Sequence, residues 1–151
     1  MPKIKHIALS TQDVDKTAKF YIEVFGMKEI AKIDSPGARG YYLSDGDLNL
    51  AILKFRTAEA ADRGDGMGTV MGLHHFGFWV EDSDEVRRRL LENEAHLLRD
   101  RPHDSPTSFF EEKWVAPDGV QFDIAQAGWA GAQPPDASLA PKDGERQAGA
   151  H

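Results

Sequence analysis

Two histidines and one aspartate in this chain could together hold a metal ion. His6, His75 and Asp123 each lie within a short stretch in which apolar and other residues alternate. Two imidazoles and one carboxylate with open coordination positions are the ligand set expected for non-haem Fe(II), and Mn(II), Ni(II) or Zn(II) also bind such groups. We therefore identify these three residues as candidate metal ligands.

The spacing of the two histidines indicates an internal repeat. His6 and His75 are 69 positions apart, and the sequence His-Ile-Ala-Leu at the first corresponds to His-Phe-Gly-Phe at the second. An acidic segment follows each of them at the same offset, beginning at Asp13 and at Asp82. Similar segments at a fixed offset are typical of duplicated structural units. We expect two copies of one unit.

The alternation predicts a strand around each candidate ligand, with one apolar face that packs on a helix. His6, His75 and Asp123 all fall on the other face of their strands, mostly beside small residues. If the sheet curls, these faces line a cavity, and the repeat brings the three strands together. His74 should point to the opposite face from His75, so it is the less favoured alternative ligand.

Each half of the chain is expected to form a strand, a helix and three further strands. In the first half these elements are predicted at Ile4–Ser10, Asp13–Phe25, Lys28–Ile33, Gly40–Leu43 and Leu48–Phe55. In the second half they are predicted at Leu73–Val80, Ser83–Asn93, His96–Arg99, Phe109–Val115 and Val120–Ala125. Ser10 or Thr11 could cap the first helix.

The fold class that follows is α+β, with two tandem βαβββ modules that form a curled eight-strand cup with one helix per module. The domain is expected to cover residues 1–129, with modules at about 1–57 and 71–129 and a linker at 58–70. Residues 130–151 are rich in Ala, Gly and Pro and have few large apolar side chains. They are predicted to be a flexible C-terminal tail, because they can bury little surface to offset the entropy of ordering.

The composition excludes several classes of protein. The 151 residues carry a formal net charge of −7, which argues against a nucleic-acid-binding protein. The absence of cysteine excludes disulfides, thiolate nucleophiles and cysteine-ligated metal sites. No apolar run approaches the roughly 20 residues of a membrane span, and no signal-peptide core follows the N-terminus. We expect a soluble, cytoplasmic protein without a membrane partner.

The paired modules, with their openings His-Ile-Ala-Leu and His-Phe-Gly-Phe, resemble the vicinal oxygen chelate superfamily. That superfamily includes glyoxalase I, methylmalonyl-CoA epimerase, type I extradiol dioxygenases and antibiotic-binding resistance proteins. The turn Ala-Pro-Asp-Gly at 116–119, followed by Asp123, is similar to its closing turn and metal-binding acid. The resemblance implies a divalent metal bound by His6, His75 and Asp123, a small-molecule substrate and a homodimer.

Two departures from the family pattern bear on the reaction. The last acid is usually Glu, whereas here it is the shorter Asp123. The fourth ligand of glyoxalase-type members has no clear counterpart, because the cavity face of the fourth strand carries Asn49, Ala51 and Leu53. Three protein ligands leave room for O2 and a chelating substrate, which favours a non-haem Fe(II) dioxygenase. A glyoxalase I or epimerase-type lyase or isomerase is the alternative, and a non-catalytic resistance-type binding protein is the third.

Residues that contact the substrate are harder to identify than the metal ligands. We identify Asn49, Trp79, Tyr41 and His103 as candidate substrate-binding residues, because they are polar or aromatic groups on cavity-forming strands or in a Pro-flanked loop. No catalytic residue is assigned from the sequence.

Overall fold

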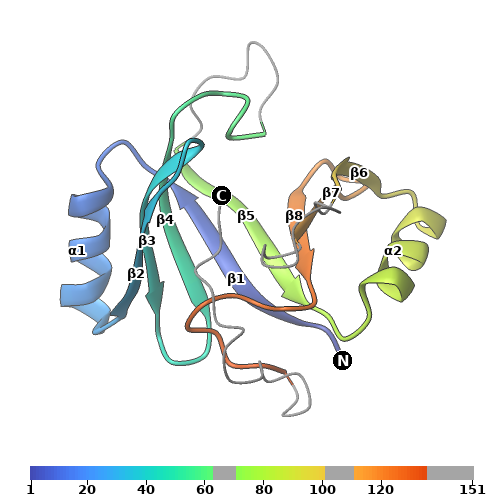
Figure 1. Cartoon of the computed structure of the whole chain (residues 1–151), viewed down its shortest axis with the longest axis horizontal. Coiled ribbons are helices and arrows are strands. Elements are labelled where there is room, and N and C mark those ends of the chain that lie inside the picture. The colour runs from blue at the N-terminus through green and yellow to red at the C-terminus, as the bar shows by residue number, and fades with distance from the viewer. Residues whose placement is uncertain (63–70, 101–110, 136–151) are drawn as a thin grey trace.

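The computed structural model of the chain contains two β-α-β-β-β modules joined into one eight-stranded mixed sheet (Figure 1). It describes residues 1–62, 71–100 and 111–135. The first module consists of β1 (Lys3–Ser10), α1 (Val14–Phe25), β2 (Lys28–Asp34), β3 (Ala38–Ser44) and β4 (Asn49–Phe55). The second consists of β5 (Gly72–Trp79), α2 (Ser83–Glu92), β6 (His96–Arg99), β7 (Glu111–Val115) and β8 (Gln121–Ala125). The predicted fold class and order of elements are confirmed.

The strand order places the three strands of the candidate site side by side. It runs β2-β3-β4-β1-β5-β8-β7-β6, so the sheet is not closed into a barrel. The central strands β1 and β5 pair antiparallel and join the modules. Each pairs on its other side with a parallel strand, β4 for β1 and β8 for β5.

The repeat is most regular at the start of each module. β5 covers the residues of β1 shifted by 69, and the two strands share one burial pattern. Each helix then begins after an aspartate, because the side chains of Asp13 and Asp82 accept hydrogen bonds from backbone N–H groups of the first turn. The prediction that Ser10 or Thr11 caps the first helix was wrong. The described residues contain no helix long and apolar enough to cross a membrane.

Two separate hydrophobic cores lie between the sheet and the helices. Val14 and Ala18 of α1 pack on Leu50 and Ile52 of β4. In the second module, Phe122 and Ile124 of β8 belong to a core that Val86 and Leu90 of α2 cover. The opposite face of the sheet, which we call the inner face, therefore holds the remaining side chains of these strands. These cores follow the alternation that the sequence predicts.

Both central strands contain a β-bulge at the residue before the candidate ligand histidine. The β1–β5 pairing leaves Lys5 without a register partner in one strand and His74 without one in the other. These two positions are equivalent in the repeat, being 69 residues apart. A bulge changes the direction of the side chain it carries, and alternation alone did not predict either bulge.

After β8 the chain crosses back to the first module, in a segment that we call the C-terminal strap (residues 126–133; Figure 1). The strap binds the first module through three hydrogen bonds. The Ser44 hydroxyl donates to the carbonyl of Gly131 at 2.8 Å, and the Asn49 amide donates to that of Ala130 at 2.7 Å. The backbone N–H of Gln133 donates to the carbonyl of Asp47 at 2.9 Å. The first residues of the predicted flexible tail are therefore docked, and 136–151 lie outside the described residues.

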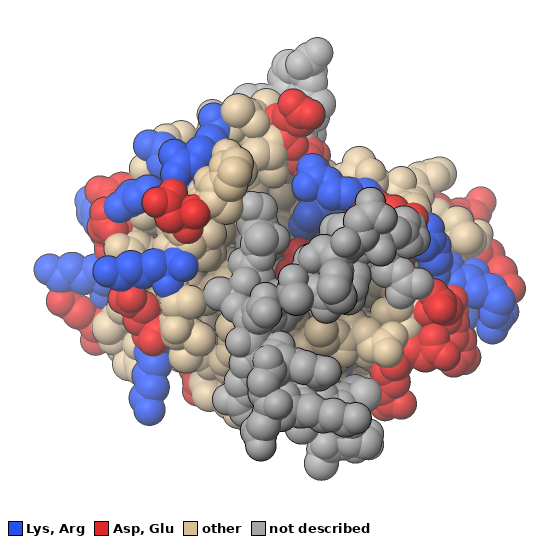
Figure 2. All heavy atoms as spheres, in the orientation of Figure 1, with Lys and Arg blue, Asp and Glu red and all other residues tan. Residues whose placement is uncertain are grey.

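Acidic and basic side chains are mixed on the face of the molecule seen in Figure 2. Lys and Arg groups lie beside Asp and Glu groups on both flanks of this face, so its described residues form no continuous basic stripe. This arrangement agrees with the net charge of −7.

Candidate metal centre

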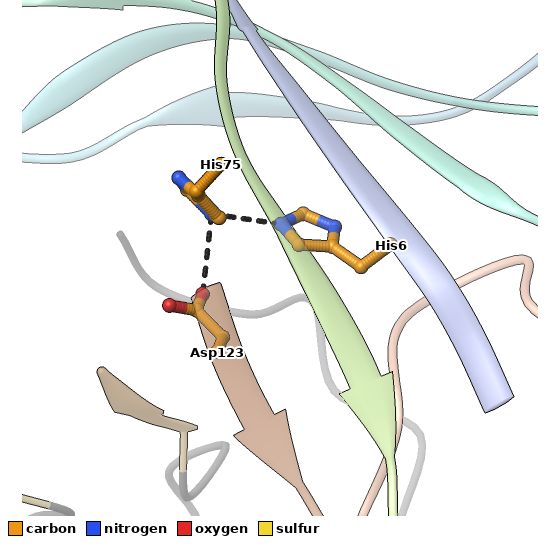
Figure 3. Close-up of side chains that lie close together, drawn as sticks. All are labelled: His6, His75 and Asp123. Carbon is orange, nitrogen blue, oxygen red and sulfur yellow. Dashed lines mark hydrogen bonds and ion pairs between the residues drawn. The ribbon is translucent and has the colours of Figure 1, made fainter. Parts of the chain in front are cut away.

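The side chains of His6, His75 and Asp123 meet on the inner face of the sheet (Figure 3). The neighbouring strands β1, β5 and β8 supply one residue each. Nε2 of His75 lies 3.1 Å from Nε2 of His6 and 3.1 Å from Oδ2 of Asp123. The three potential ligand atoms lie within 4.8 Å of one another, and all three residues are buried. These separations would allow one divalent ion to bind all three, and that they do so remains a prediction.

Gly77 provides the space in which this triad forms. It lies in β5 between two of the triad positions, pairing with His6 in β1 and with Asp123 in β8. A methyl group on its Cα would lie 3.2 Å from Cβ of His6 and 2.7 Å from the indole ring of Trp129. The absence of a side chain at this position therefore lets an aromatic ring approach the triad.

Hydrogen bonds fix the tautomer of His6. The amide nitrogen of Asn49 donates to the carbonyl of Ala130, which turns its oxygen toward Nδ1 of His6 at 2.7 Å. Nδ1 of His6 must then carry the proton, so the lone pair of Nε2 faces the triad. Burial, and next the charge of His75, lower the pKa of His6 to about 3. The imidazole is therefore neutral near pH 7, as a metal ligand must be.

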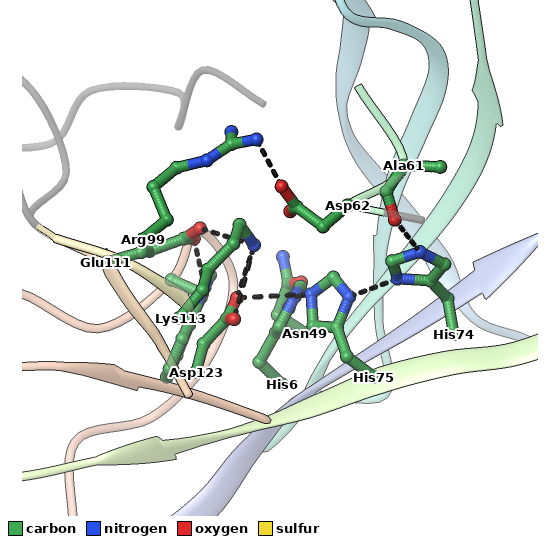
Figure 4. Close-up of polar contacts among 11 residues, drawn as sticks. His6, Asn49, Ala61, Asp62, His74, His75, Arg99, Glu111, Lys113 and Asp123 are labelled. Atoms are coloured by element: carbon green, nitrogen blue, oxygen red, sulfur yellow. Dashed lines mark hydrogen bonds and ion pairs between the residues drawn. The ribbon is translucent and has the colours of Figure 1, made fainter. Parts of the chain in front are cut away.

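Lys113 lies against the carboxylate of Asp123 (Figure 4). Its Nζ is 3.2 Å from Oδ1 and 3.1 Å from Oδ2. Burial disfavours the charged form of Asp123, but His75 and Lys113 outweigh it and hold the pKa of this carboxyl below its usual range. An ionised carboxylate has lone pairs for more than one partner. Asp123 can therefore accept from Lys113 and still offer an oxygen to a metal ion.

The donor set of this site fits a divalent transition metal. The Nε2 atoms of His6 and His75 lie only 3.1 Å apart, and the Asp123 carboxylate is equally near one of them. Lone pairs and negative charge at such distances repel one another, unless a proton or a cation lies between them. Two nitrogens and one oxygen suit Fe(II), Mn(II), Ni(II) or Zn(II).

The carboxyl group of Glu111, whose side chain is 9% exposed, also lies beside the triad. The indole N–H of Trp129 donates to its Oε1 at 2.6 Å, and its Oε2 is 3.9 Å from Nζ of Lys113. Burial, and next the charge of Asp123, raise the pKa of Glu111 to about 7. Glu111 is therefore a carboxyl group that can hold or release a proton near neutral pH.

Trp129 connects this carboxyl group to the triad. Its ring lies parallel to that of His6, with 4.8 Å between the centroids and 5° between the planes. The strap carries this residue back over the inner face, where only 4% of it is exposed. Trp129 thus covers His6 and holds Glu111 at the same time.

The additional residues Glu111, Lys113 and Trp129 differ in how clearly the sequence indicates them. Glu111 and Lys113 share one face of a strand, opposite Trp114, and two charged groups beside the strand of Asp123 could have indicated a polar inner face. Trp129 had no such signal, because it follows Gly128 at the point where the composition changes.

The four candidate substrate-binding residues lie in different places. Asn49 is buried next to His6, which it orients. Trp79 packs with Ala125 and with Trp129 of the strap, and its indole N–H donates to the carbonyl of Gln126. Tyr41 lies away from the triad, because it packs with the core under α1 and its hydroxyl donates to Asp15. His103 lies outside the described residues.

The fourth strand supplies no ligand atom to the described triad. Ala51 pairs with Ala8 in β1, as Asp123 pairs with Gly77 in β5. Because Ala8 and Gly77 are equivalent in the repeat, Ala51 occupies the first-module position that corresponds to Asp123. Its methyl group cannot coordinate a metal, and the neighbouring Asn49 is already bonded to His6 and Ala130.

Comparison with known proteins agrees with this architecture. The family model described as the Glyoxalase/Bleomycin resistance protein/Dioxygenase superfamily matches residues 3–114. A search of curated proteins found no match.

Solved structures with a similar fold include several epimerases. A variant of Streptomyces coelicolor methylmalonyl-CoA epimerase in complex with 2-nitronate-propionyl-CoA is 22% identical, with a TM-score of 0.66 over 82% of this chain and 95% of that one. Methylmalonyl-CoA epimerase from Mycobacterium tuberculosis is 18% identical, with a TM-score of 0.63 over 91% of both chains. A hypothetical protein from Bacillus halodurans C-125 is 20% identical, with a TM-score of 0.67 over 82% of this chain and 93% of that one. At these identities the likeness shows the fold alone.

Proposed function

Because the chain belongs to the Glyoxalase/Bleomycin resistance protein/Dioxygenase superfamily, we propose that it is a divalent-metal-dependent isomerase of the epimerase type. Such an enzyme moves a proton at a carbon atom next to a carbonyl group. The observation that carries the proposal is the position of Glu111, a largely buried carboxyl group beside the triad that is not needed as a ligand. The proposal replaces the dioxygenase that the sequence favours, because the sequence does not place this carboxyl group beside the triad.

Each residue has a defined task in this proposal. A divalent ion bound by His6, His75 and Asp123 would supply a Lewis acid that stabilises negative charge on the carbonyl oxygens of the substrate. Glu111 would accept the proton as the C–H bond breaks, and the electron pair of that bond would pass to the carbonyl group. A proton delivered from solvent to the other face of the planar carbon would complete the epimerisation, and in the reverse direction Glu111 would act as the donor.

The surroundings of Glu111 support this assignment. The hydrogen bond from Trp129 fixes one carboxyl oxygen, while the charge of Lys113 lies on the side of the other. Near pH 7 the two protonation states of Glu111 have similar free energies, since its pKa is raised to about 7. A proton acceptor that must also become a donor is most effective in that range.

We infer the class of substrate from the chemistry of the site. Two oxygen atoms of one small molecule could occupy neighbouring coordination positions left open by three protein ligands. A 2-substituted acyl thioester with a second carbonyl or carboxylate group has this arrangement and an acidic C–H bond. The epimerases that share the fold carry such a thioester in their names, which makes methylmalonyl-CoA the first compound to test. A homodimeric assembly also stays a prediction.

Exchange of hydrogen with solvent tests the proposal directly. Metal-loaded protein is incubated with methylmalonyl-CoA and related 2-substituted acyl thioesters in D2O, and deuterium at the carbon next to the carbonyl is followed by mass spectrometry. We expect exchange well above the protein-free rate, and a loss of about 100-fold or more in Glu111→Gln. Glu92→Gln, which alters an exposed carboxylate on α2, is the matched control.

Two results would overturn the epimerase proposal. One is the absence of exchange with every thioester, although the protein binds a divalent ion. The other is exchange that Glu111→Gln leaves at the wild-type rate, since another group would then move the proton.

A non-haem Fe(II) dioxygenase remains the second candidate, and Ala51 is the observation that favours it. With a methyl group at the fourth-strand position, the described part of the chain offers three ligands, as O2 chemistry requires. Oxygen uptake by protein loaded with Fe(II) without air, and then mixed with catechols, tests this candidate. Uptake that depends on catechol, together with no deuterium exchange, would favour the dioxygenase over the epimerase.

A further inference from the structure

The bulge in β5 places His74 next to the candidate ligand His75. Alternation predicts that the two side chains point to opposite faces, yet Nδ1 of His74 lies 2.7 Å from Nδ1 of His75 (Figure 4). The equivalent bulged residue of the first module, Lys5, instead pairs with Asp47. The contact between neighbouring histidines is therefore a feature of the second module alone.

The other ring nitrogen of His74 is bonded to the backbone. Its Nε2 lies 2.6 Å from the carbonyl oxygen of Ala61. This carbonyl lies in a turn with its own anchors, since the N–H of Ala61 donates to Thr57 and the carbonyl of Asp62 accepts from Gln121. A carbonyl oxygen only accepts hydrogen bonds, so Nε2 of His74 must carry a proton.

This proton determines the arrangement of the remaining ones. A neutral His74 with its proton on Nε2 has a lone pair on Nδ1, which can only accept. Nδ1 of His75 must then donate to it, and Nε2 of His75 is left with a lone pair. That lone pair faces His6 and Asp123, where the ion would lie.

We propose that His74 is a positioning residue that selects the metal-binding tautomer of His75 and fixes the orientation of its ring. It does for His75 what Asn49 does for His6, and each of the two is anchored on a backbone carbonyl. The inference rests on the proposed use of a metal ion. Partners of this kind typically change metal affinity by about 10–100-fold.

Substitutions at position 74 separate the hydrogen bond from the packing of the ring. His74→Phe keeps a ring against Phe55, whose centroid is 4.6 Å away, but removes the acceptor. His74→Leu is a smaller variant without an acceptor, in case the phenyl ring does not fit. His74→Asn keeps an acceptor oxygen close to the place of Nδ1. His96→Leu, at an exposed histidine of β6, is the matched control.

Two measurements are made on each folded variant. Affinity for Zn²⁺ is measured by competition with a chelator, and the tautomer of His75 is measured in metal-free protein by ¹⁵N NMR of the histidine rings. We expect His74→Phe and His74→Leu to bind Zn²⁺ about 10–100-fold more weakly and to lose the full protonation of Nδ1 of His75 that the wild type shows. His74→Asn and His96→Leu should stay close to the wild type.

The outcomes distinguish this inference from the proposed function. Wild-type affinity and tautomer in His74→Phe or His74→Leu would overturn the role of His74, as would an Asn variant as weak as the Phe variant. A wild-type protein that binds no Zn²⁺, but whose His75 tautomer depends on His74, would support the positioning role and overturn the metal-dependent function.

Discussion

At the scale of single residues, burial shifts the pKa values of two groups at this site in opposite directions. It lowers the pKa of His6 to about 3 and raises that of Glu111 to about 7, because in both cases it disfavours the charged form. Both groups are therefore close to neutral, or easily neutralised, in the metal-free protein. Folding stability should depend on pH through both of them, with opposite signs.

Glu111→Gln should change the pH dependence of stability in metal-free protein. The pKa of Glu111 is raised from 4.5 to about 7 on folding, so its stabilising contribution is present below pH 4.5 and is lost as the pH rises through 7. The variant cannot lose this contribution. Relative to wild type, its free energy of unfolding should rise by up to about 3 kcal/mol between pH 4.5 and 8. Urea denaturation at several pH values measures this difference, and parallel curves would contradict it.

That the triad residues lie together could be predicted from the sequence, because alternation and repetition both constrained them. His6 and His75 occupy equivalent positions, and Asp123 follows a recognisable turn. Glu111 was not assigned a role, because charged residues on a strand face solvent in most proteins and nothing in the sequence showed that this face is covered. The cover is Trp129, whose place depends on contacts far from it in the chain.

At the scale of elements, β1 and β5 are equivalent strands of the repeat that have different neighbouring residues. Ala8 and Gly77 occupy equivalent positions on the inner face. Ala8 packs in an apolar cluster with Ala51 and Leu53, where a methyl group fits. Gly77 lies under the indole ring of Trp129, where a methyl group does not fit.

Gly77→Ala should therefore destabilise the fold, chiefly by colliding with Trp129. We expect a loss of about 1–3 kcal/mol in the free energy of unfolding, as overpacked cores show. In a Trp129→Ala background the same substitution should cost less, because the ring that it meets is gone. A double-mutant cycle from urea denaturation measures this coupling. An equal cost in both backgrounds would mean that the clash lies elsewhere.

The type and order of the elements could be predicted, whereas the bulges could not. A bulge depends on how two strands pair. The repeated sequence indicates which residues form each strand, but it does not indicate the register between the strands. The β1–β5 register leaves out Lys5 and His74, and this irregularity brings His74 to its neighbour. For the same reason the sequence placed His74 on the wrong face.

At the scale of the whole molecule, the C-terminal strap connects the end of the second module to the first. It carries Trp129 to the inner face and anchors Asn49 through the carbonyl of Ala130. The sequence indicated only an Ala-, Gly- and Pro-rich tail, because a few docked residues in such a segment do not change its composition. The position of the strap depends on its hydrogen bonds to the first module, whose residues lie far from it in the sequence.

Truncation tests the strap. A chain that ends at Gln126 lacks Trp129 and should lose about 3–5 kcal/mol of stability, the usual cost of removing a buried aromatic ring. Its metal affinity should also fall, since Asn49 loses the carbonyl that orients it. A chain that ends at Pro135 keeps the strap and should resemble the full chain. Equal stability of the two truncated chains in urea would show that the strap contributes little.

The central pairing of β1 with β5 has a consequence for how the molecule unfolds. The triad spans this boundary, with His6 on one side and both His75 and Asp123 on the other. An ion bound there would act as a cross-link between two halves whose strands pair at β1 and β5. Its binding free energy would stabilise the association of the two halves, and not the fold of either half alone. Loss of the ion would then favour separation of β1 from β5 before either helix unfolds.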